Sequence, residues 1–343
     1  MSAETITAFG NTLIDAYSQR SEEIFVRRIK PDSPVNTLFD YIRSLPGEGV
    51  LGVGQLDIDG INGGGQYAGR KIIKTSTGNT VSTFVSGDPR PGGGVHTDTT
   101  AQWEWRNYWT TIHMRGDILR AGTSGAMWTN MDAWAEKMES AFADIYDQID
   151  TDLCGAGGSG KIDGIDAIFG DTNTYANIDR TSVLNWKSYK KTASAALSLS
   201  LLNDVDLTLR STRRVNYDHI LVPIEQEYKA ADIIDARRRN VNDIYPGDVI
   251  YKGRPIIPIA GLESTHAYFC NSRNWRMRFQ PFRNGSLLGV ENPNAQSVVR
   301  EGVPFGLFIG DDGSDGLLVT IAMSCNVMYL NTWESAWLDA LTA

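Results

Sequence analysis

Hydrophobic and polar positions follow a helical period most clearly over residues 126–154, a stretch without glycine or proline. Apolar side chains recur there every three or four residues, which predicts an amphipathic helix of about 27 residues, roughly 40 Å long. They are Met131, Trp134, Met138, Phe142, Ile145, Ile149 and Leu153. The opposite face carries Asp132, Glu136, Lys137, Glu139, Asp144 and Asp147. Only about four heptads are present and cationic partners are few, so we expect a helix packed on a sheet and not a coiled coil.

The first 45 residues are polar and show two short helical patterns separated by Pro31 and Pro34. The apolar positions are Phe9, Leu13 and Tyr17 in the first pattern and Leu38, Tyr41, Ile42 and Leu45 in the second. Helices this short are not stable alone in water. We therefore expect an arm that docks on another part of the protein.

Residues 50–110 resemble a long two-stranded excursion. Residues 71–85 alternate between β-branched and polar side chains, and residues 100–114 are rich in Trp, Tyr and Thr, so both predict strands. Glycine clusters bracket the first strand and make the backbone there pliable. Outside Trp103, Trp105 and Trp109 the segment has few apolar anchors. Because a two-stranded ribbon is marginal in water, its stability should come from a neighbour.

After Gly155 the pattern becomes mixed α and β. A helix is predicted over about residues 198–214 with Leu202, Val205 and Leu209 inward, and residues 219–222 form a buried strand. Pro223 is expected at the first position of a third helix, where its missing N–H has no cost. Residues 249–257 predict a hairpin that turns at Lys252-Gly253.

The chain closes with a strong strand over residues 317–329 and a short helix that contains Trp333 and Trp337. The apolar run of residues 317–330 is the longest in the chain, but Thr320, Ser324 and Asn326 interrupt it. A membrane-spanning helix needs about 20 largely apolar residues, so we expect none. The N-terminus lacks the basic and apolar pattern of a secretory signal.

Composition and charge then narrow the functional classes. With 343 residues, 41% hydrophobic and 21% charged, the chain has the composition of a soluble globular protein and not of a disordered one. The net charge of −9 argues against general affinity for nucleic acid, although a local basic patch remains compatible with it. Cys154, Cys270 and Cys325 lie far apart in sequence without a C-x-x-C pair, so we expect reduced, buried thiols in a cytosolic protein.

The glycine-rich loop Gly155–Lys161 is the most tempting chemical motif. Its sequence, GAGGSGK, contains G-x-G-x-x-G and comes close to a phosphate-binding loop. Ile162 stands where that loop needs a Ser or Thr for Mg²⁺, and the motif follows a helix instead of a strand. A glycine stop at the end of a helix explains it better, with a nucleotide-binding enzyme as the alternative.

Other candidate chemistry is weaker. His96, His113, His219 and His266 show no metal-ligand spacing, and no nucleophile motif is present. Asp57 with Asp59, and the group Asp311, Asp312 and Asp315, lie in glycine-rich turns; the second group lacks the closing glutamate of a calcium loop. We therefore expect no catalytic, cofactor-binding or metal-binding residues.

Cations and aromatic residues alternate over residues 273–283, as on stacking platforms for single-stranded nucleic acid. In a strand, however, Arg276 and Arg278 share one face while Trp275, Met277 and Phe279 share the other. A half-buried strand is thus the preferred interpretation. Residues 237–239, three arginines, are expected to close a helix at its carbonyl end.

The order of these parts resembles the tailed-phage major capsid proteins of the Hong Kong 97 fold. Short motifs agree: the long helix ends in Gly155-Ala156-Gly157, and Ile178-Asp179-Arg180-Thr181 with Trp186 is similar to the segment that enters the family's apical domain. Residues 251–256, residues 267–271 with Trp275, and the run of residues 203–235 resemble its hairpin, following strand and helix–strand unit. One departure is the lack of a charged, coiled-coil-like N-terminal segment, which implies a separate scaffolding protein or processing.

The resemblance implies an α+β chain with an N-terminal arm (1–45), an extended β-hairpin loop (46–110), a peripheral domain with the spine helix (111–160), an apical α/β domain (161–300) and a closing peripheral strand with the C-terminus (301–343). It implies a non-enzymatic shell subunit that forms pentamers and hexamers around phage double-stranded DNA. Scaffolding, portal and decoration proteins are the implied partners, with no membrane and no cofactor. The implied location is the virion, and the host cytoplasm before assembly. An encapsulin-type bacterial compartment is the alternative with the same fold.

Overall fold

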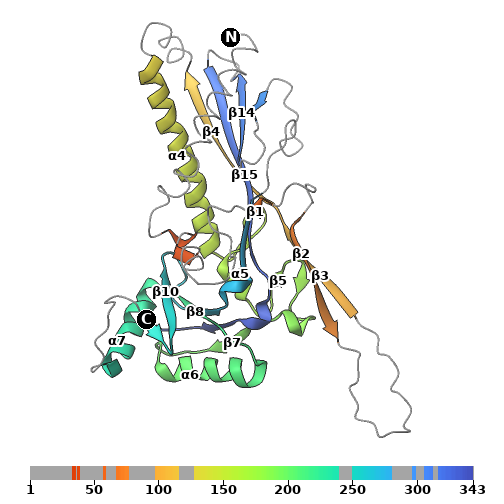
Figure 1. The fold of residues 1–343 in the computed structure, drawn as a ribbon, viewed down its shortest axis with the longest axis vertical. Helices are drawn as coiled ribbons and strands as arrows, with labels where there is room; N and C mark the ends of the chain where they lie inside the picture. The colour runs from red at the N-terminus through yellow and green to blue at the C-terminus, as the bar shows by residue number, and fades with distance from the viewer. Residues whose placement is uncertain are drawn as a thin grey trace. The chain divides into compact units, whose positions relative to one another are not determined.

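The computed structural model describes residues 33–35, 37–38, 57–58, 67–76, 97–115, 127–238, 249–279, 296–298, 305–311 and 316–342 (Figure 1). The chain falls into two structural units. Unit 1 comprises Met1–Ala68, Trp105–Ile162 and Met277–Val327, and unit 2 comprises Gly69–Glu104, Asp163–Arg276 and Met328–Ala343. Among the described residues, no helix is both long enough and apolar enough to span a bilayer.

A six-stranded sheet built around one long strand forms the framework of unit 1. Its strands are β1 (Asp57–Ile58), β4 (Arg106–Arg115), β12 (Trp275–Phe279), β13 (Gln296–Val298), β14 (Phe305–Asp311) and β15 (Gly316–Tyr329). The order is β1-β12-β15-β14-β13, and β4 also pairs with β15. Ile321 of β15 lies opposite Leu307 of β14 and Thr110 of β4 in antiparallel register. The predicted closing strand is therefore confirmed.

Helix α4 (Met127–Cys154) confirms the predicted long helix almost to the residue (Figure 1). It packs against β4, as expected for a helix that covers a sheet. The buried face comprises Met138, Ala141, Phe142, Ile145, Tyr146, Ile149 and Leu153. Lys137, Asp144 and Asp147 are exposed on the other face. The side chains of Met131, Trp134, Asp132 and Glu136 lie outside the described residues. The helix exists because its apolar stripe has a sheet to cover.

A short part of the predicted arm docks on α4. Ser33 Oγ donates to Asp150 Oδ2 at 2.7 Å, and the Val35 backbone N–H donates to Asp150 Oδ1 at 3.0 Å. Val35 and Leu38 are buried. A carboxylate that accepts two hydrogen bonds at the start of a helical turn acts like a cap supplied by another element. The first predicted arm helix, around Phe9 to Tyr17, lies outside the described residues.

Unit 2 contains a second six-stranded sheet of mixed direction. Its strands are β7 (Tyr189–Thr192), β8 (His219–Pro223), β9 (Ile250–Tyr251), β10 (Arg254–Ile259), β11 (Ala267–Cys270) and β16 (Ala336–Asp339). The order is β7-β16-β11-β8-β10-β9. The pairs β8–β10 and β7–β16 are parallel, and the other pairs are antiparallel.

Two helices cover one face of this sheet, and the hydrophobic core lies between the sheet and these helices. Helix α6 (Leu199–Thr208) begins at the N-cap Ser198 and continues as a π-helical turn, η3 (Leu209–Arg213). Helix α7 is Ile224–Arg238. The core joins both helices to β8, β10, β11 and β16 through Leu202, Val205, Leu209, Ile220, Val222, Ala230, Ile234, Ile256, Phe269 and Leu338. The predicted helix over residues 198–214 is confirmed.

The predicted hairpin at Lys252-Gly253 is also confirmed. Both turn residues have positive φ, 50° and 79°, as a two-residue hairpin of the favoured twist requires. Behind the turn, the buried carboxylate of Asp206 in α6 binds Lys252 Nζ and Arg254 Nη1, each at 2.9 Å. These ion pairs and hydrogen bonds outweigh burial and keep the pKa of Asp206 below its ordinary value. The hairpin is thus tied to the helix through charge as well as packing.

Three sequence predictions are wrong in detail. Trp337 lies in strand β16, not in a helix, because Ala336–Asp339 pairs with β11 on one side and β7 on the other. Only the 3₁₀ turn η5 (Thr332–Glu334) precedes it. Pro223 ends β8, where a missing donor is equally harmless, and α7 begins one residue later. The single strand expected over residues 100–114 is broken at Trp105, because its two halves pair with different partners.

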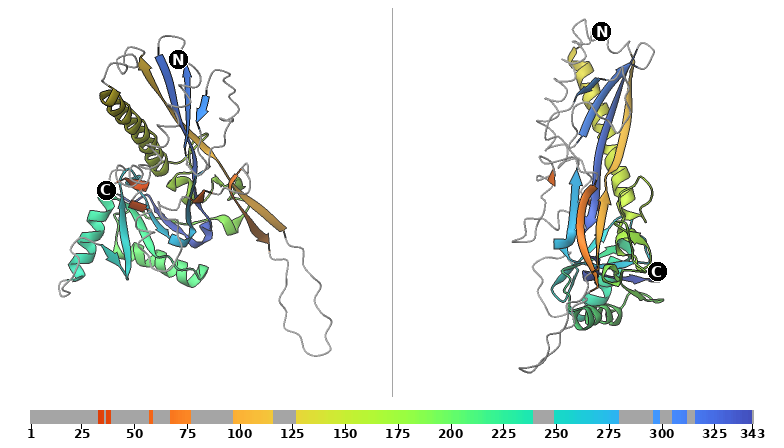
Figure 2. Two further views of the ribbon diagram at one scale, coloured as in Figure 1. Left: turned by 45° about the horizontal axis from the view of Figure 1, so that its top comes forward. Right: turned by 90° about the vertical axis from the view of Figure 1, so that its right-hand side faces the viewer.

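The first half of that broken strand forms a separate two-stranded ribbon. Strand β2 (Tyr67–Ser76) pairs with β3 (Thr97–Glu104), as Figure 2 shows. Residues 77–85 of the predicted first strand lie outside the described residues. A small hairpin, β5 (Thr174–Tyr175) with β6 (Ile178–Asp179), and the short helix α5 (Ile165–Phe169) complete unit 2 together with η2 (Leu184–Trp186) and η4 (Ser272–Asn274).

Candidate functional site

The ribbon of β2 and β3 is held at one end by a buried cluster of four aromatic side chains and one arginine, which we call the anchor cluster. Its members are Trp103, Tyr175, Arg180, Trp186 and Tyr329. Trp103 of β3 is 1% exposed, and its Nε1–H donates to Tyr175 Oη at 2.9 Å. Tyr175 Oη in turn accepts from the Tyr329 backbone N–H at 2.8 Å, and the Trp186 Nε1–H donates to the Tyr175 carbonyl at 3.1 Å. The rings of Trp103, Tyr175 and Trp186 lie about 6 Å apart by centroid, in edge and stacked contacts worth about 0.5–1.5 kcal/mol per pair beyond burial.

Arg180 contacts both the Tyr175 ring of the anchor cluster and the backbone at the end of α5. The side chain is fully buried, and its guanidinium lies 5.0 Å from the centre of the Tyr175 ring. Its Nη1 donates to the carbonyls of Ala167 at 3.0 Å and Gly170 at 2.6 Å, and Nη2 donates to the Ile168 carbonyl. These are carbonyls at the end of α5 that lack partners within the helix. Burial lowers the pKa of Arg180 to about 10, which still leaves it charged near neutral pH.

The motif of residues 178–186 that carries the sequence resemblance therefore has a structural role. Asp179 forms a local turn by accepting from the Thr181 backbone N–H and hydroxyl, at 2.8 and 2.7 Å. Arg180 then turns inward, and Trp186 closes over Tyr175. The motif folds the β5–β6 hairpin around the anchor cluster, and the β3 backbone joins it where the Gln102 N–H donates to the Ala176 carbonyl at 2.9 Å.

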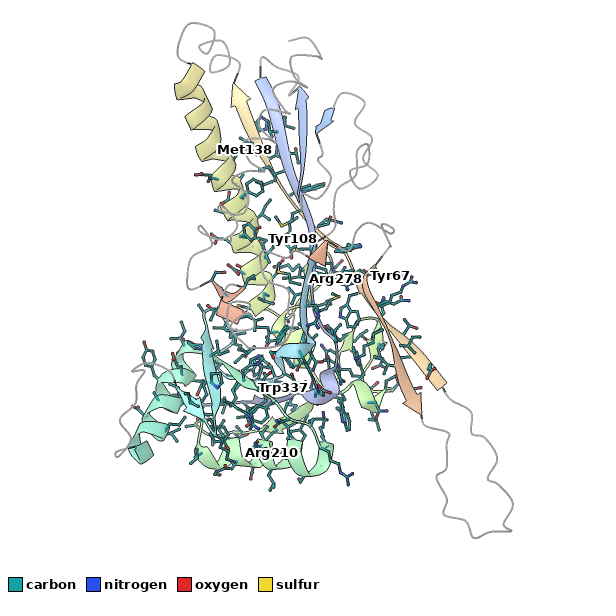
Figure 3. All side chains as sticks on the ribbon, viewed as in Figure 1. Tyr67, Tyr108, Met138, Arg210, Arg278 and Trp337 are labelled. Atoms are coloured by element: carbon teal, nitrogen blue, oxygen red, sulfur yellow. The ribbon has the colours of Figure 1, made fainter. Side chains whose placement is uncertain are left out.

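Beyond the anchor cluster, the ribbon presents an apolar side chain to solvent. Ile72 of β2 is 70% exposed, whereas the adjacent Ile73 is buried. Lys71 is held by a hydrogen bond from Nζ to the Leu330 carbonyl at 2.6 Å. A two-stranded ribbon with an exposed β-branched residue is suited to contact another chain. Figure 3 shows the side chains of the ribbon as sticks, with Tyr67 at the start of β2 labelled.

The glycine-rich loop Gly155–Lys161 follows the end of a helix, as expected. Helix α4 ends at Cys154, and Gly157, Gly158 and Gly160 have φ values of 73°, 154° and 79°. Lys161 Nζ, which a nucleotide site would direct at phosphate, lies 3.1 Å from Asp152 Oδ1. The element that follows is only the five-residue α5. The lysine therefore pairs with the helix that precedes it.

Asp152 of α4 connects that loop to the helix and to β4. Its side chain is buried, and it accepts from Tyr108 Oη at 2.9 Å and from Gln148 Nε2 at 2.8 Å (Figure 3). Tyr108 Oη accepts from the Ile162 backbone N–H at 3.0 Å, so loop, helix and β4 meet at one hydrogen-bonded group. Burial raises the pKa of Tyr108.

A second polar group, the His266 cluster, brings together residues that are far apart in sequence. His266 precedes β11, and its Nδ1 lies 3.4 Å from Asp166 Oδ1 and 3.7 Å from Glu263 Oε2. Its Nε2 lies 3.2 Å from Asp339 Oδ1. Burial lowers the pKa of His266, but the hydrogen bond and charge of Asp166, with Glu263 and Asp339, raise it above its ordinary value overall. Asp166, Glu263 and His266 could together hold a metal ion.

The sequence analysis missed this cluster because its members are separated by up to about 170 positions and carry no spacing motif. Of the other histidines, His113 is exposed on β4 and His219 is buried beside Asp218. His96, Asp59, Asp312 and Asp315 lie outside the described residues. Cys154, Cys270 and Cys325 are free and buried, as expected. Burial raises the pKa of Cys325 to about 12, which makes its thiol unreactive.

The arginine-rich segment of residues 273–283 proves to be a half-buried strand where the structure describes it. In β12, Trp275 and Met277 are buried while Arg276 and Arg278 alternate with them. Trp275 packs against Phe169 and Tyr329 with ring centroids 5.7 and 5.0 Å away. Its aromatic face is therefore used inside the protein and is not available for stacking on bases.

Comparison of the sequence with protein-family models and with curated proteins finds no match. The structure is similar to one solved as the cyanophage A-1(L) capsid asymmetric unit, with a TM-score of 0.60, 16% identity and coverage of 87% of this chain and 95% of that one. The capsid of a native GTA particle gives 0.47, with 10% identity over 80% and 84% of the chains. The SrpI encapsulin of Synechococcus elongatus PCC 7942 gives 0.43, with 11% identity over 72% and 78%.

The likeness to the cyanophage protein extends over nearly the whole of both chains, and it shows that the two share a fold. The fold is an α+β phage-capsid fold of Hong Kong 97 type, as the sequence resemblance predicts.

The anchor cluster leads to a matched tryptophan test. Replacing the buried Trp103 by Ala should lower the free energy of unfolding by about 3–5 kcal/mol, because a large cavity opens and Tyr175 loses a donor. Replacing Trp109, which is 65% exposed on β4, should change it by no more than about 0.5 kcal/mol. Urea unfolding of the purified chain measures both. Equal effects of the two substitutions would show that β3 is not anchored through Trp103.

The glycine-rich loop leads to a second test. Lys161 is 53% exposed, so Lys161→Ala should cost less than about 1 kcal/mol of unfolding free energy. Asp152→Ala should cost more, about 1–3 kcal/mol, because it leaves the buried Tyr108 hydroxyl without its acceptor. Neither variant should differ from the parent in ATP binding, which calorimetry would find absent. A micromolar ATP affinity that Lys161→Ala abolishes would instead make the loop a nucleotide site.

Proposed function

We propose that this chain is a major capsid protein, a structural subunit that assembles into an icosahedral shell around phage double-stranded DNA. The observation that carries the proposal is the fold shared with the cyanophage A-1(L) capsid protein over 87% of this chain and 95% of that one. On this proposal the protein works through contacts between its own copies and not through catalysis.

The ribbon of β2 and β3 supplies the physical reason for an assembly role. Its base is fixed by Trp103 and the Lys71 hydrogen bond, but two strands alone bury too little apolar surface to be stable. Ile72 remains exposed where a neighbouring subunit could cover it. In the proposed shell, the extended loop (46–110) and the arm (1–45) clamp adjacent subunits, so that stability missing from the single chain is gained on assembly.

The remaining parts receive roles from the same proposal. The peripheral domain, proposed over residues 111–160 with 301–343, lies mainly in unit 1, where α4 packs on β4. Its last part, Met328–Ala343, groups instead with unit 2, where β16 pairs with β11 and β7. The apical domain, residues 161–300, meets its copies around five-fold and six-fold axes, giving pentamers and hexamers. Such contacts are heterologous and close by rotation, and the resulting rings tile a shell.

The proposed partners follow from the assembly. In addition to copies of itself, the proposed partners are a scaffolding protein, a portal and a decoration protein. The net charge of −9 fits a shell that encloses DNA without sequence-specific binding. The protein would reside in the virion, and in the host cytoplasm before assembly. An encapsulin-type shell remains the alternative, distinguished by a protein cargo in place of DNA.

Expression of the full chain, alone and together with a candidate scaffolding protein, tests the proposal. We expect sedimentation to show pentamers, hexamers or larger particles and negative-stain microscopy to show closed shells. Particles from an infected host should contain nuclease-protected double-stranded DNA. A monomer under every salt and scaffold condition would contradict the assembly role, and particles filled with one enzyme would favour the encapsulin alternative.

A matched pair of variants at one position tests the ribbon's part in assembly. Ile72→Asp should leave the subunit's melting temperature unchanged, because the side chain is exposed, but should reduce the yield of closed shells by placing a charge in an apolar contact. Ile72→Val keeps a β-branched apolar side chain and should assemble normally. Normal shells from the Asp variant would remove Ile72 from the proposed contact.

A further inference from the structure

The sheet of unit 2 carries polar side chains where β11 begins and β16 ends. They lie on the face opposite the helix-covered core. In the antiparallel register of β11 and β16, Ala267 lies opposite Leu338 and Tyr268 opposite Trp337. One step further, the same register places His266 opposite Asp339. His266 and Tyr268 therefore share a face with Trp337 and Asp339, since alternate residues of a strand point the same way.

We propose that Asp166, Glu263 and His266 bind a divalent transition-metal ion, with zinc the best match to these donors. The three ligand atoms, Asp166 Oδ1, a Glu263 carboxylate oxygen and His266 Nδ1, all lie within 4.8 Å of one another. Zinc bonds of about 2.0–2.1 Å at tetrahedral angles place ligand atoms about 3.3 Å apart. The distances from Nδ1 to the two carboxylates, 3.4 and 3.7 Å, are close to that spacing.

The other nitrogen of the imidazole has the partner that a metal-binding histidine needs. His266 Nε2 lies 3.2 Å from Asp339 Oδ1, and with the proton on Nε2 it donates to that carboxylate. Nδ1 then faces Asp166 and Glu263, with the Tyr268 hydroxyl oxygen 3.0 Å away, and a bound metal ion would replace this contact between Nδ1 and Tyr268. A carboxylate behind the imidazole fixes the tautomer and raises the basicity of the ligating nitrogen. Lys190 Nζ, 2.7 Å from Asp339 Oδ2, holds that carboxylate in place from β7.

The surroundings fix the geometry of the site and its charge. The Tyr268 hydroxyl donates to Asp166 Oδ1, and the His266 ring stands edge-on to Trp337 at 5.0 Å between centroids. Three carboxylates, Asp166, Glu263 and Asp339, meet one lysine here, so a bound cation reduces the excess negative charge. A mixed set of one nitrogen and two oxygens favours zinc over calcium or magnesium, which prefer oxygen ligands alone.

Access to the site matches a metal taken from solution. The His266 side chain is 12% exposed and Glu263 is 55% exposed, so the imidazole is fixed while the glutamate can close over an ion. With three protein ligands, a fourth coordination position remains for water. The inference concerns a single subunit and does not depend on the proposed assembly.

The test uses the full-length chain without an affinity tag, stripped with a chelator and dialysed. Calorimetric titration near neutral pH with Zn²⁺ should give one site per chain, and Co²⁺ should give the visible absorption of a four-coordinate nitrogen–oxygen site. At about 100-fold excess over the dissociation constant, Zn²⁺ should raise the melting temperature by about 5–10 °C. Ca²⁺ and Mg²⁺ at the same concentration should not.

Variants separate a metal site from a structural ion-pair cluster. Asp339→Asn should weaken Zn²⁺ binding by about 10–100-fold through the lost partner of the imidazole. Glu263→Gln, which changes an exposed side chain, should weaken it at least as much while leaving the metal-free melting temperature unchanged. Glu225→Gln, an exposed carboxylate on α7, is the matched control and should bind like the parent. The proposal is overturned if the parent chain binds no Zn²⁺ at one per chain, or if Glu263→Gln binds it as tightly as the parent.

Discussion

A two-stranded ribbon is marginally stable in water on its own, and the buried guanidinium of Arg180 supports the cluster that anchors this one. Arg180 satisfies three carbonyls around the end of α5 and lies on the Tyr175 ring. Tyr175 then holds Trp103 of the ribbon and the backbone of Tyr329 through one hydroxyl. Removing the cation would take a donor from the Ile168 and Gly170 carbonyls and the guanidinium from the Tyr175 ring, and would thereby weaken the cluster that holds β3.

The sheet of unit 2 uses its two faces differently. One face is an apolar core under α6 and α7, and it supplies the stability of the unit. The other carries Tyr268 and Trp337 in its middle and the His266 cluster at its edge. The polar residues of the His266 cluster therefore lie on strands whose position is fixed by the apolar core on the other face. A change of ligand or charge at that edge need not disturb the packing beneath the helices.

The local sequence pattern predicts secondary structure well where the residues of a segment alone determine its conformation. Helix α4 follows from its apolar stripe, and the hairpin at Lys252-Gly253 follows from a residue pair that tolerates positive φ. Prediction fails where tertiary pairing decides. Trp337 has helical spacing from Trp333 but is fixed in β16 by strands on both sides. The break at Trp105 reflects two pairing partners for β3 and β4, which no local pattern encodes.

The His266 cluster was beyond reach for the same reason. Its residues come from α5, the turn before β11 and the end of β16, and only the register of the sheet brings them together. The anchor cluster could be predicted only in part. The motif around Arg180 could be recognised by resemblance, but its reason, a buried cation beneath aromatic rings that hold β3, becomes visible only in the fold.

The ribbon is fixed at its base within the chain and, in the proposed shell, is completed by a neighbour. Hydrogen exchange of the amides in Tyr67–Ser76 and Thr97–Glu104, followed by mass spectrometry, tests it most directly when unassembled subunits and closed shells are compared. The account predicts that amides near Trp103 are protected in both states, whereas those around Ile72 become protected only in the shell. Equal protection around Ile72 in both states, whether high or low, would contradict it.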